Sequence, residues 1–586
     1  MKLTKTNLIL IAIFIIAFIT RFYAAAHVDI GSDEIIYSLI PLHIIDAGRL
    51  STVEQAPVYF YLTDLSYKLF GDLTLVSTRF TSILFGATAT ILIYLISLKI
   101  FNNKNAALLS SFLFALSGYA IRHNQEMDMT AYFLSLLSLY FFLYVLENKT
   151  NYLYPSLGIL AIASLVKPIV LLFAPAYFLT WFILNWKNQH GLIYKKENKY
   201  HLEPNTLKTI FLSLLLCLLI VAPVLTYNYL LYKEKGMTDY YFTTLAGIGN
   251  AQIYKGQEAN PWTIIRSVGT VWSSFINFLK IDPIITIAGI IGLCYVWTKK
   301  KDQTLLICST LFFLYLYLGG IMGSPTHYVW VPLILSIFAG HTIIHLAEKI
   351  QHKLSFKQII YILCIFLLFT TSFTLYNISK LKDASIQNLL NEYATDNLPS
   401  NAIIIVDPRV YRGVYSLALS DRHYLEGTSF PQLIDNLDKL PGTKQTLPFY
   451  YIECGPGKYC GWKPEDYNHI ADYGKQLSAS LIPNMKKIKE IKTADTLVIY
   501  QSTINAPISI YEPIDRTHNH WYTPIGWKYT ENAVDNYTPK NFFDKTLNSL
   551  SFVILYIDIF IAILSIPFVF YILFRTKQEN QTPETK

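Results

Sequence analysis

The chain has 586 residues, of which 53% are hydrophobic and only 15% are charged, and its mean hydropathy is +0.34. Soluble domains carry more charge, so the composition excludes an ordinary soluble protein and indicates one with many membrane spans. The net charge of +8 does not indicate nucleic-acid binding, because the lysines lie in short loops between apolar runs. There they report how the protein is oriented in the membrane.

Twelve apolar runs are candidates for helices that cross a bilayer, which takes about 20 residues. They lie at about 7–26, 75–98, 106–122, 129–146, 152–166, 168–186, 209–231, 283–298, 304–320, 328–347, 358–376 and 550–574. The fifth run is short, and a separate amphipathic stretch, Trp262–Leu279, precedes the eighth. The first run ends in Tyr23-Ala-Ala-Ala and could be a signal peptide. We favour an uncleaved span, because the next loop needs an anchor on both sides.

Basic residues assign alternate loops to the cytoplasm. With the N-terminus inside, the loops on its side carry Lys99, Lys104, Lys149, Lys187, Lys195, Lys196, Lys199, Lys208, Lys299, Lys300, Lys301, Lys349, Lys353, Lys357, Arg575 and Lys577. The opposite set contains 26–73, 123–128, the turn at Lys167, 232–282, 321–327 and 377–549. Twelve spans place both termini inside. We therefore expect a multi-pass protein of the plasma or inner membrane.

This topology predicts that the chain has three parts. Residues 1–376 form the transmembrane domain, with a first outer loop at 27–73, and residues 550–586 hold the last span and a cytoplasmic tail. Residues 377–549 form an outer soluble α/β domain with predicted strands at Ala402–Val406, Pro448–Ile452 and Thr496–Tyr500 and a helical run near Leu477–Lys489. The expected fold class is mainly α, a bundle of about twelve spans with this small domain near the C-terminus.

Only two of the six cysteines, Cys454 and Cys460, lie in polar sequence. Between them stand Gly and Pro turn residues, so a disulfide-closed hairpin suits the oxidising outer compartment. A zinc site would need two more ligands, and His423 and His469 are too scattered to supply them. We therefore predict a disulfide and no protein-bound metal site.

The first outer loop is too polar to cross a bilayer and carries an acidic pair, Asp33-Glu34. Two amphipathic segments follow, about Glu34–Asp46 and Val58–Phe70, with the helical spacing expected of helices on the membrane surface. Taken alone, the two acids fit an ordinary loop with solvated carboxylates. The rest of the sequence favours a functional loop.

Other polar residues also fall at outer ends of spans. They are Arg79, the cluster Arg122, His123, Glu126 and Asp128, then Lys167, and the pair His327 and Tyr328. Charges this close to lipid are costly unless paired or hydrated. One alone would fit a structural ion pair, but several groups on one face indicate a site.

The types of these residues suit one reaction. Arg79, Lys167, Arg122 and His123 can bind phosphate oxygens as cations, and Arg can do so with two parallel hydrogen bonds. A carboxylate beside the phosphate can act as general base on an acceptor hydroxyl while the cations stabilise the leaving phosphate. An apolar groove between spans would hold the lipid of the donor. The sequence thus favours sugar transfer from a polyprenyl phosphate.

Five motifs give the chain a resemblance to the C-fold (GT-C) membrane glycosyltransferases of family 39, which include protein O-mannosyltransferases and the aminoarabinose transferase of lipid A. They are Asp33-Glu34 with the later Glu54-Gln-Ala-Pro57-Val-Tyr59, TRFTSILFG around Arg79, Glu126-Met-Asp128, LVKP at 165–168 and THYVWVP at 326–332. Together they cover about the first 350 residues. The WWDYG motif of oligosaccharyltransferases is absent from the sequence, which argues against transfer of a whole oligosaccharide to asparagine.

The resemblance implies a glycosyltransferase that uses a lipid-phosphate-linked hexose or pentose, with Asp33 as catalytic base and Glu34 as its neighbour. Arg79, Lys167 and the group around Asp128 would form the donor and phosphate site. Many relatives carry Lys or His before the proline of the first loop, where this chain has Gln55-Ala56-Pro57, so another cation would bind the phosphate. The acidic residues permit a divalent cation, which the resemblance does not require. The acceptor would be a hydroxyl or phosphate group of a lipid, a protein or a polysaccharide.

A different class remains as the alternative, a polytopic secondary transporter of a small polar or lipid-linked solute. Transporters place binding groups near the midplane on broken helices and often consist of repeated halves. Here the charges gather at the outer ends and no repeat is visible. A sensor or scaffold that displays 377–549 would need only one or two spans.

Overall fold

The structure of the chain is a computed structural model. It describes residues 4–31, 34–35, 48–53, 56–71, 74–125, 127–188, 193–196, 199–202, 204–239, 241–243, 268–321, 325–350, 355–383, 385–420, 422–457, 459–461, 468–511 and 536–575. Asp33, Gln55 and Glu126, each predicted to serve in the site, lie outside the described residues. So does most of the predicted helix Glu34–Asp46.

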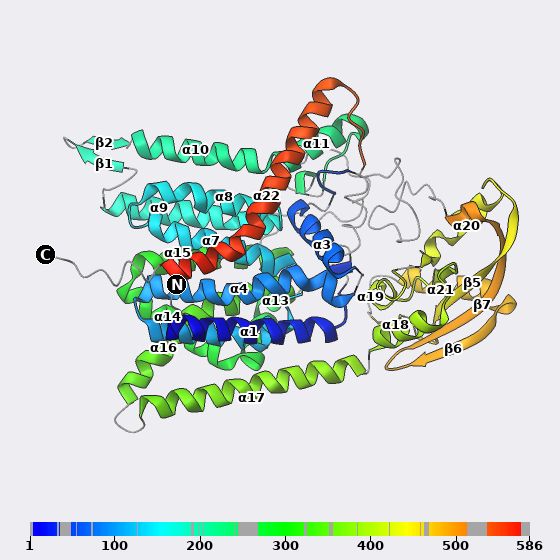
Figure 1. Cartoon of the computed structure of the whole chain (residues 1–586), viewed down its shortest axis with the longest axis horizontal. Helices are drawn as coiled ribbons and strands as arrows, with labels where there is room; N and C mark the ends of the chain where they lie inside the picture. The colour runs from blue at the N-terminus through cyan, green and yellow to red at the C-terminus, as the bar shows by residue number, and fades with distance from the viewer. Residues whose placement is uncertain are drawn as a thin grey trace.

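A helical bundle makes up most of the molecule (Figure 1). Its helices are α1 (Lys5–His27), α3 (Pro57–Phe70), α4 (Leu75–Phe101), α5 (Lys104–Ala115), α6 (Gly118–Arg122), α7 (Met127–Val145), α8 (Leu153–Ser164), α9 (Phe173–Asn188), α10 (Pro204–Ile220), α11 (Ala222–Lys235), α13 (Val268–Ile281), α14 (Pro283–Lys299), α15 (Lys301–Ile321), α16 (Trp330–Ile350), α17 (Phe356–Asp383) and α22 (Phe542–Arg575). The 3-10 turns are η1 (Thr150–Tyr152), η2 (Pro168–Leu172) and η4 (Pro325–Tyr328), and β1 (Ile193–Lys196) pairs with β2 (Lys199–Leu202) in a hairpin.

Each predicted span coincides with a helix or a pair of helices, although their lengths differ. In the described part of the chain, six helices are long and apolar enough to cross a membrane by themselves, namely α1, α4, α7, α16, α17 and α22. Two bent pairs raise the number to eight. α10 and α11 meet at 53°, and the end of α13 meets α14 at 119°. Other predicted spans are shorter helices, such as α5 and α8 with 12 residues each. The protein is thus a multi-pass membrane protein, and the count of twelve depends on these shorter helices.

The two ends of the bundle differ. In Figure 1, α1 begins and α22 ends at one end, where the β1–β2 hairpin also lies, while the sheet domain occupies the opposite end. The predicted topology likewise separates the two termini from residues 377–549. We call the end that carries the sheet domain the outer end and this domain the outer domain, and their place on the non-cytoplasmic side stays a prediction.

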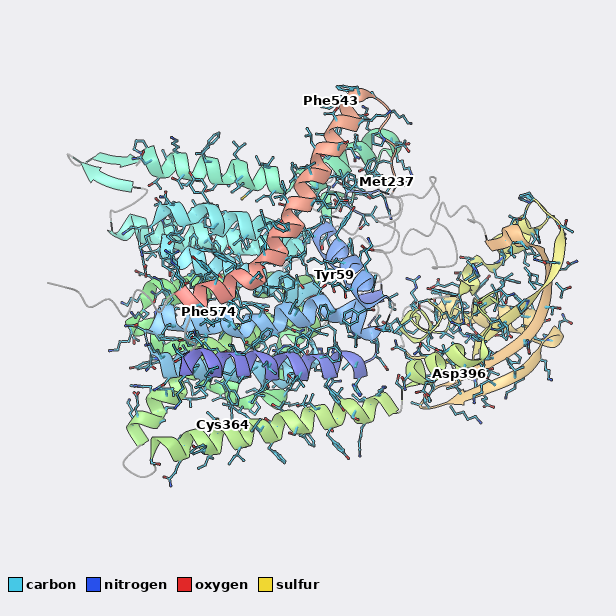
Figure 2. The ribbon with its side chains drawn as sticks, viewed as in Figure 1. Tyr59, Met237, Cys364, Asp396, Phe543 and Phe574 are labelled. Atoms are coloured by element: carbon cyan, nitrogen blue, oxygen red, sulfur yellow. A yellow bond between two sulfur atoms is a disulfide. The ribbon has the colours of Figure 1, made fainter. Side chains whose placement is uncertain are left out.

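Helix α17 lies at the edge of the bundle and leads into the sheet domain (Figure 1). In Figure 2, Cys364 is labelled on α17 and Asp396 on the helix that follows it. Its side chains Tyr361, Ile365 and Phe369 are each 67–68% exposed and recur every fourth residue. Such an apolar stripe suits a lipid-facing surface. On the other side, Thr371 Oγ1 donates a hydrogen bond to Leu116 O (2.9 Å). α17 therefore packs against the bundle and leads into the outer domain.

The outer domain contains a five-stranded sheet. Its strands are β3 (Ile403–Val406), β4 (His423–Glu426), β5 (Lys444–Cys454), β6 (Lys486–Lys492) and β7 (Thr496–Pro507), in the order β4-β3-β5-β7-β6. β4, β3 and β5 are parallel, and β7 and β6 continue the sheet antiparallel. Around it lie α18 (Ile386–Asn397), α19 (Arg412–Tyr415), α20 (Phe430–Leu437), α21 (Asn468–Leu481) and the turns η5 (Gly427–Ser429), η6 (Ile482–Asn484) and η7 (Ile508–Tyr511).

The central strand β3 is buried on both faces of the sheet, to which its side chains point in alternation. Ile404 and Val406 of β3 pack on one face in a cluster with Leu390 of α18. Ile403 and Ile405 pack on the other face with α20 and α21. A parallel core covered on both faces explains the uninterrupted apolar run of β3. The predicted α/β domain is present.

One predicted element was wrong. The helical run near Leu477–Lys489 ends at Leu481 in the structure, and β6 follows at Lys486–Lys492. Ile488 and Ile491 are three residues apart, which mimics a helix, but a register shift between Lys487 and Lys489 puts both against the same cluster. A β-bulge has this effect, since it adds one residue to one strand.

Cys454 and Cys460 form a disulfide at the end of β5, as their spacing predicts. We expect the double substitution Cys454→Ser, Cys460→Ser to lower the free energy of unfolding by about 2 kcal/mol, because the short loop gains entropy in the unfolded chain. Thermal unfolding in detergent measures this. Cys217→Ser, at a free cysteine in α10, is the control. Two free thiols in the denatured, alkylated wild type would contradict the pairing.

Candidate functional site

Three of the predicted site residues meet at the outer end of the bundle. Asp128 Oδ2 lies 2.6 Å from Lys167 Nζ, Lys167 Nζ lies 2.7 Å from His327 Nδ1, and His327 Nδ1 lies 3.1 Å from Asp128 Oδ1. Their side chains are only 1%, 5% and 4% exposed, in that order. We call this group the buried triad. Its members are up to 199 residues apart in the sequence.

Local structure puts each member at the end of a helix. Asp128 lies in the first turn of α7, where the helix dipole favours a carboxylate. Lys167 is the break between α8 and η2, and the following Pro168 cannot donate the hydrogen bond that would continue α8. His327 lies in η4, just before α16, and Tyr132 Oη donates to its backbone carbonyl (2.7 Å). Breaks between helices therefore bring the three side chains together.

The hydrogen bonds within the triad do not use all of its N–H donors. Nδ1 of His327 lies within hydrogen-bond distance of both Lys167 Nζ and Asp128 Oδ1, so its role depends on the tautomer of the ring. An ammonium group only donates, so in the tautomer that accepts from Lys167 the ring proton lies on Nε2. Among the described residues Nε2 has no hydrogen-bond partner, although it is buried. The contacts of Lys167 use two of its three N–H groups. One carboxylate next to an ammonium and an imidazole donor suits an anion such as phosphate better than a cation.

Arg79 lies differently from what the sequence suggests. Its Nε donates to Glu34 Oε1, and its Nη2 donates to Glu34 Oε2 (2.8 Å) and to Asp29 O (3.1 Å). Nη1 donates to the carbonyls of Ala25 (2.6 Å) and Val28 (2.7 Å). These bonds occupy all five N–H groups of the guanidinium, which is fully buried. In this arrangement Arg79 has no N–H group for a phosphate and instead holds the first outer loop.

Glu34 belongs to the same clamp. Besides the bidentate ion pair with Arg79, its Oε2 accepts from the backbone N–H of Gly31 (3.2 Å). A carboxylate buried and bonded in this way is not available as a base. Of the predicted acidic pair, this leaves Asp33 as the candidate base.

The far end of the first loop is also fixed. Ala56, just before α3, has a positive φ of 67°, and Pro57 begins the helix. Val58 N donates to Leu165 O (3.2 Å), two residues before Lys167. The predicted helix Val58–Phe70 is thus α3, and its first turn is bonded to the segment that carries Lys167.

The structure places three further predicted residues, Arg122, His123 and Tyr328. Arg122 is exposed at the end of α6, and the ring of His123 lies 4.6 Å from that of Tyr119. Within the described part of the chain, no hydrogen bond or ion pair joins either of them to the triad. Tyr328 is buried, with its ring 6.3 Å from that of Phe278. No group of three His, Cys, Asp or Glu residues that could hold a metal ion occurs among the described residues.

Sequence reasoning gave no role to Asn124, which stands in the chain between His123 and Gln125. Its Nδ2 donates to Ser82 O (2.8 Å), and its buried Oδ1 has no partner in the described structure. Gly86 makes room for it, since a Cβ at that position would overlap Oδ1. The glycine at the end of TRFTSILFG was the one signal in the sequence.

The ion pair of the triad gives a stability prediction. Lys167→Met should lower the free energy of unfolding by about 3–5 kcal/mol, because it leaves the Asp128 carboxylate buried without its cation. Lys167→Met combined with Asp128→Asn should recover much of this loss. Lys99→Met is the control, since Lys99 and Glu147 form a partly exposed pair that should contribute less than about 1 kcal/mol. Equal losses in thermal unfolding for Lys167→Met and Lys99→Met would contradict the burial of the triad.

Comparisons with known proteins agree with this architecture. Residues 54–227 match the family described as dolichyl-phosphate-mannose-protein mannosyltransferase. This stretch holds Arg79, Asp128 and Lys167. A search of curated proteins found no match to the sequence.

Two similar solved structures are of ArnT from Cupriavidus metallidurans. The one bound to undecaprenyl phosphate has a TM-score of 0.56 at 15% identity, and the apo structure has 0.53 at 12%. In both comparisons the alignment covers 84% of this chain and 97% of ArnT. At this identity the likeness establishes the fold. Together with the family match, it confirms the resemblance of this chain to the C-fold membrane glycosyltransferases of family 39.

Proposed function

We propose that the protein is a membrane glycosyltransferase that moves a sugar from a polyprenyl-phosphate donor to a hydroxyl or phosphate acceptor on the outer side of the membrane. The buried triad is the observation that carries this proposal. Three separate membrane segments bring Asp128, Lys167 and His327 together at the outer end of the bundle. Two N–H donors left over there can bind a phosphate oxygen at the depth of a lipid headgroup.

In this reaction the donor phosphate accepts from Lys167 Nζ and His327 Nε2. Asp128 holds Lys167 in place and balances its charge. The acceptor oxygen attacks the anomeric carbon of the sugar, the bond from this carbon to the phosphate oxygen breaks, and the electron pair leaves with the polyprenyl phosphate. Lys167 stabilises the charge that develops on the leaving group. The acceptor proton moves to the carboxylate of Asp33.

The other predicted residues have supporting functions in this scheme. Arg79 and Glu34 hold the loop that carries Asp33, so the donor site depends on Lys167 rather than on Arg79. Arg122 is an exposed cation that attracts the anionic donor, and His123 stands next to it in the chain. Gln55 and Glu126 stay in the proposal as donor-binding residues, because they stand in the sequence just before α3 and α7.

The fold supports a donor of this class. The ArnT structure with the higher TM-score is described as bound to undecaprenyl phosphate, a polyprenyl phosphate. The charges of this chain also suit group transfer at the outer surface better than transport. They gather at helix ends, whereas transporters usually place their binding groups near the midplane.

Asp33→Asn tests the assigned base. The amide keeps the size of the side chain but cannot take a proton, so turnover should fall by about two to four orders of magnitude. Binding of a polyprenyl-phosphate sugar should persist, because it depends on the triad. Single-turnover transfer per folded molecule and donor binding measure the two effects. Full turnover in a well-folded Asp33→Asn protein would refute the assignment, whereas lost yield with normal turnover would make Asp33 structural.

The proposed side of the membrane has its own test. In a background without the free cysteines, Ser400→Cys in the outer domain should react with a membrane-impermeant thiol reagent in intact cells. Asn105→Cys, exposed at the start of α5 at the opposite end of the bundle, is the matched control and should react only after permeabilisation. The reverse pattern would overturn the orientation and the outer site with it.

A further inference from the structure

The outer domain touches the first outer loop directly. Ser385 Oγ donates to Asp29 Oδ1 (2.6 Å), and Gln387 Oε1 accepts from the backbone N–H of Ile30 (2.9 Å). Gly413, in α19, lies so close to the loop that an added Cβ would be 2.8 Å from Ile30 O. Three parts of the domain surface thus contact two adjacent residues of the loop. Figure 1 shows α18 and α19 on the side of the domain that faces the bundle.

The two side chains are well placed to hold the loop. Ser385 and Gln387 are each 5% exposed and belong to the first turn of α18. Ser385 Oγ also accepts from Asn388 N (3.1 Å), so the serine caps this helix. Since α17 ends at Asp383, the position of both side chains is tied to a membrane span. These contacts are therefore built into the fold.

Arg79 of α4 forms hydrogen bonds to the same stretch of the loop. It bonds the carbonyls of Ala25, Val28 and Asp29 and the carboxylate of Glu34, while the outer domain bonds the side chain of Asp29 and the amide of Ile30. The backbone on the N-terminal side of Asp33 is thus held between the bundle and the domain.

We propose that Ser385 and Gln387 are positioning residues, through which the outer domain places the acidic first loop for the transfer reaction. The inference rests on the proposed function, in which Asp33 of this loop is the base. A general base must lie within hydrogen-bond reach of the proton that it takes. A displacement of about 1 Å can lower a rate about a hundredfold. The domain acts on turnover in this way without contacting the reacting atoms.

Two variants separate positioning from helix capping. Ser385→Asp keeps a good N-cap for α18 but sets a second carboxylate against Asp29. Combining it with Asp29→Asn removes the repulsion and should restore the wild-type behaviour. Gln387→Leu removes the acceptor of the Ile30 amide, and Gln387→Glu retains an acceptor there. Glu392→Ala is the matched control, since Glu392 lies exposed on the same helix and accepts only from Asn388 among the described residues.

Turnover and donor affinity are measured for each variant. We expect kcat to fall at least tenfold in Ser385→Asp and Gln387→Leu while the Kd for a polyprenyl-phosphate sugar changes less than twofold. Ser385→Asp with Asp29→Asn, Gln387→Glu and Glu392→Ala should retain most of the wild-type kcat. Parallel losses of kcat and donor affinity, or no rescue by Asp29→Asn, would refute a positioning role.

Hydrogen exchange supplies a readout that needs no activity. The peptide containing Ile30 should exchange faster in Ser385→Asp and Gln387→Leu, and Asp29→Asn should slow it again in the first. Unchanged exchange would overturn the proposal. Faster exchange with full turnover would also overturn it while leaving the proposed function intact, whereas a wild-type protein that transfers no sugar would refute the proposed function itself.

Discussion

The full hydrogen bonding of Arg79 is the constraint that shapes the outer face of this protein. A guanidinium cannot lose its proton at any ordinary pH, so a buried one must find a partner for each donor. Here the partners are Glu34 and three carbonyls at the end of α1 and the start of the first outer loop. The loop that returns from α1 is thereby fastened to α4. The contacts of Asp29 and Ile30 with the outer domain depend on these bonds, because the bonds fix the position of the loop.

The buried triad also holds a buried cation, Lys167, but its hydrogen bonds are incomplete. Lys167 and Asp128 balance each other, but the triad leaves one N–H of Lys167 and the Nε2 of His327 without partners in the described structure. A buried donor without a partner costs free energy comparable to a lost hydrogen bond. Folding alone explains Arg79, whose N–H groups all have partners, whereas a ligand best explains the N–H groups that the triad leaves unused. This difference is why the proposed donor site is centred on Lys167 and not on Arg79.

Much of this architecture could be predicted from local features of the sequence. Runs of about 20 apolar residues and lysine-rich loops placed the helices and their ends, and the sidedness that followed put Asp128, Lys167 and His327 on one face. What the sequence could not supply were partners chosen by tertiary packing. Nothing near Arg79 indicates that backbone carbonyls will take its donors, and Ser385 and Gln387 lie about 357 residues from the loop that they contact. The isoleucines of β6 misled for a related reason, since a bulge is visible only once the neighbouring strand is in place.

In the outer domain, a hydrogen-bond network occupies the position where a ligand site would be expected. Its strand order β4-β3-β5 has a topological switch point between β3 and β5, where sheets of this kind usually bind ligands at their carboxyl ends. Here Asp407 fills that position and accepts from Arg409 (2.6 Å), Tyr451 (3.1 Å) and the N–H of Cys454 (3.3 Å). The disulfide to Cys460 closes the same edge. The usual crevice is therefore occupied by the chain itself. The start of α18 links this domain to the proposed chemistry, because Ser385 and Gln387 there hold the loop that carries the proposed base.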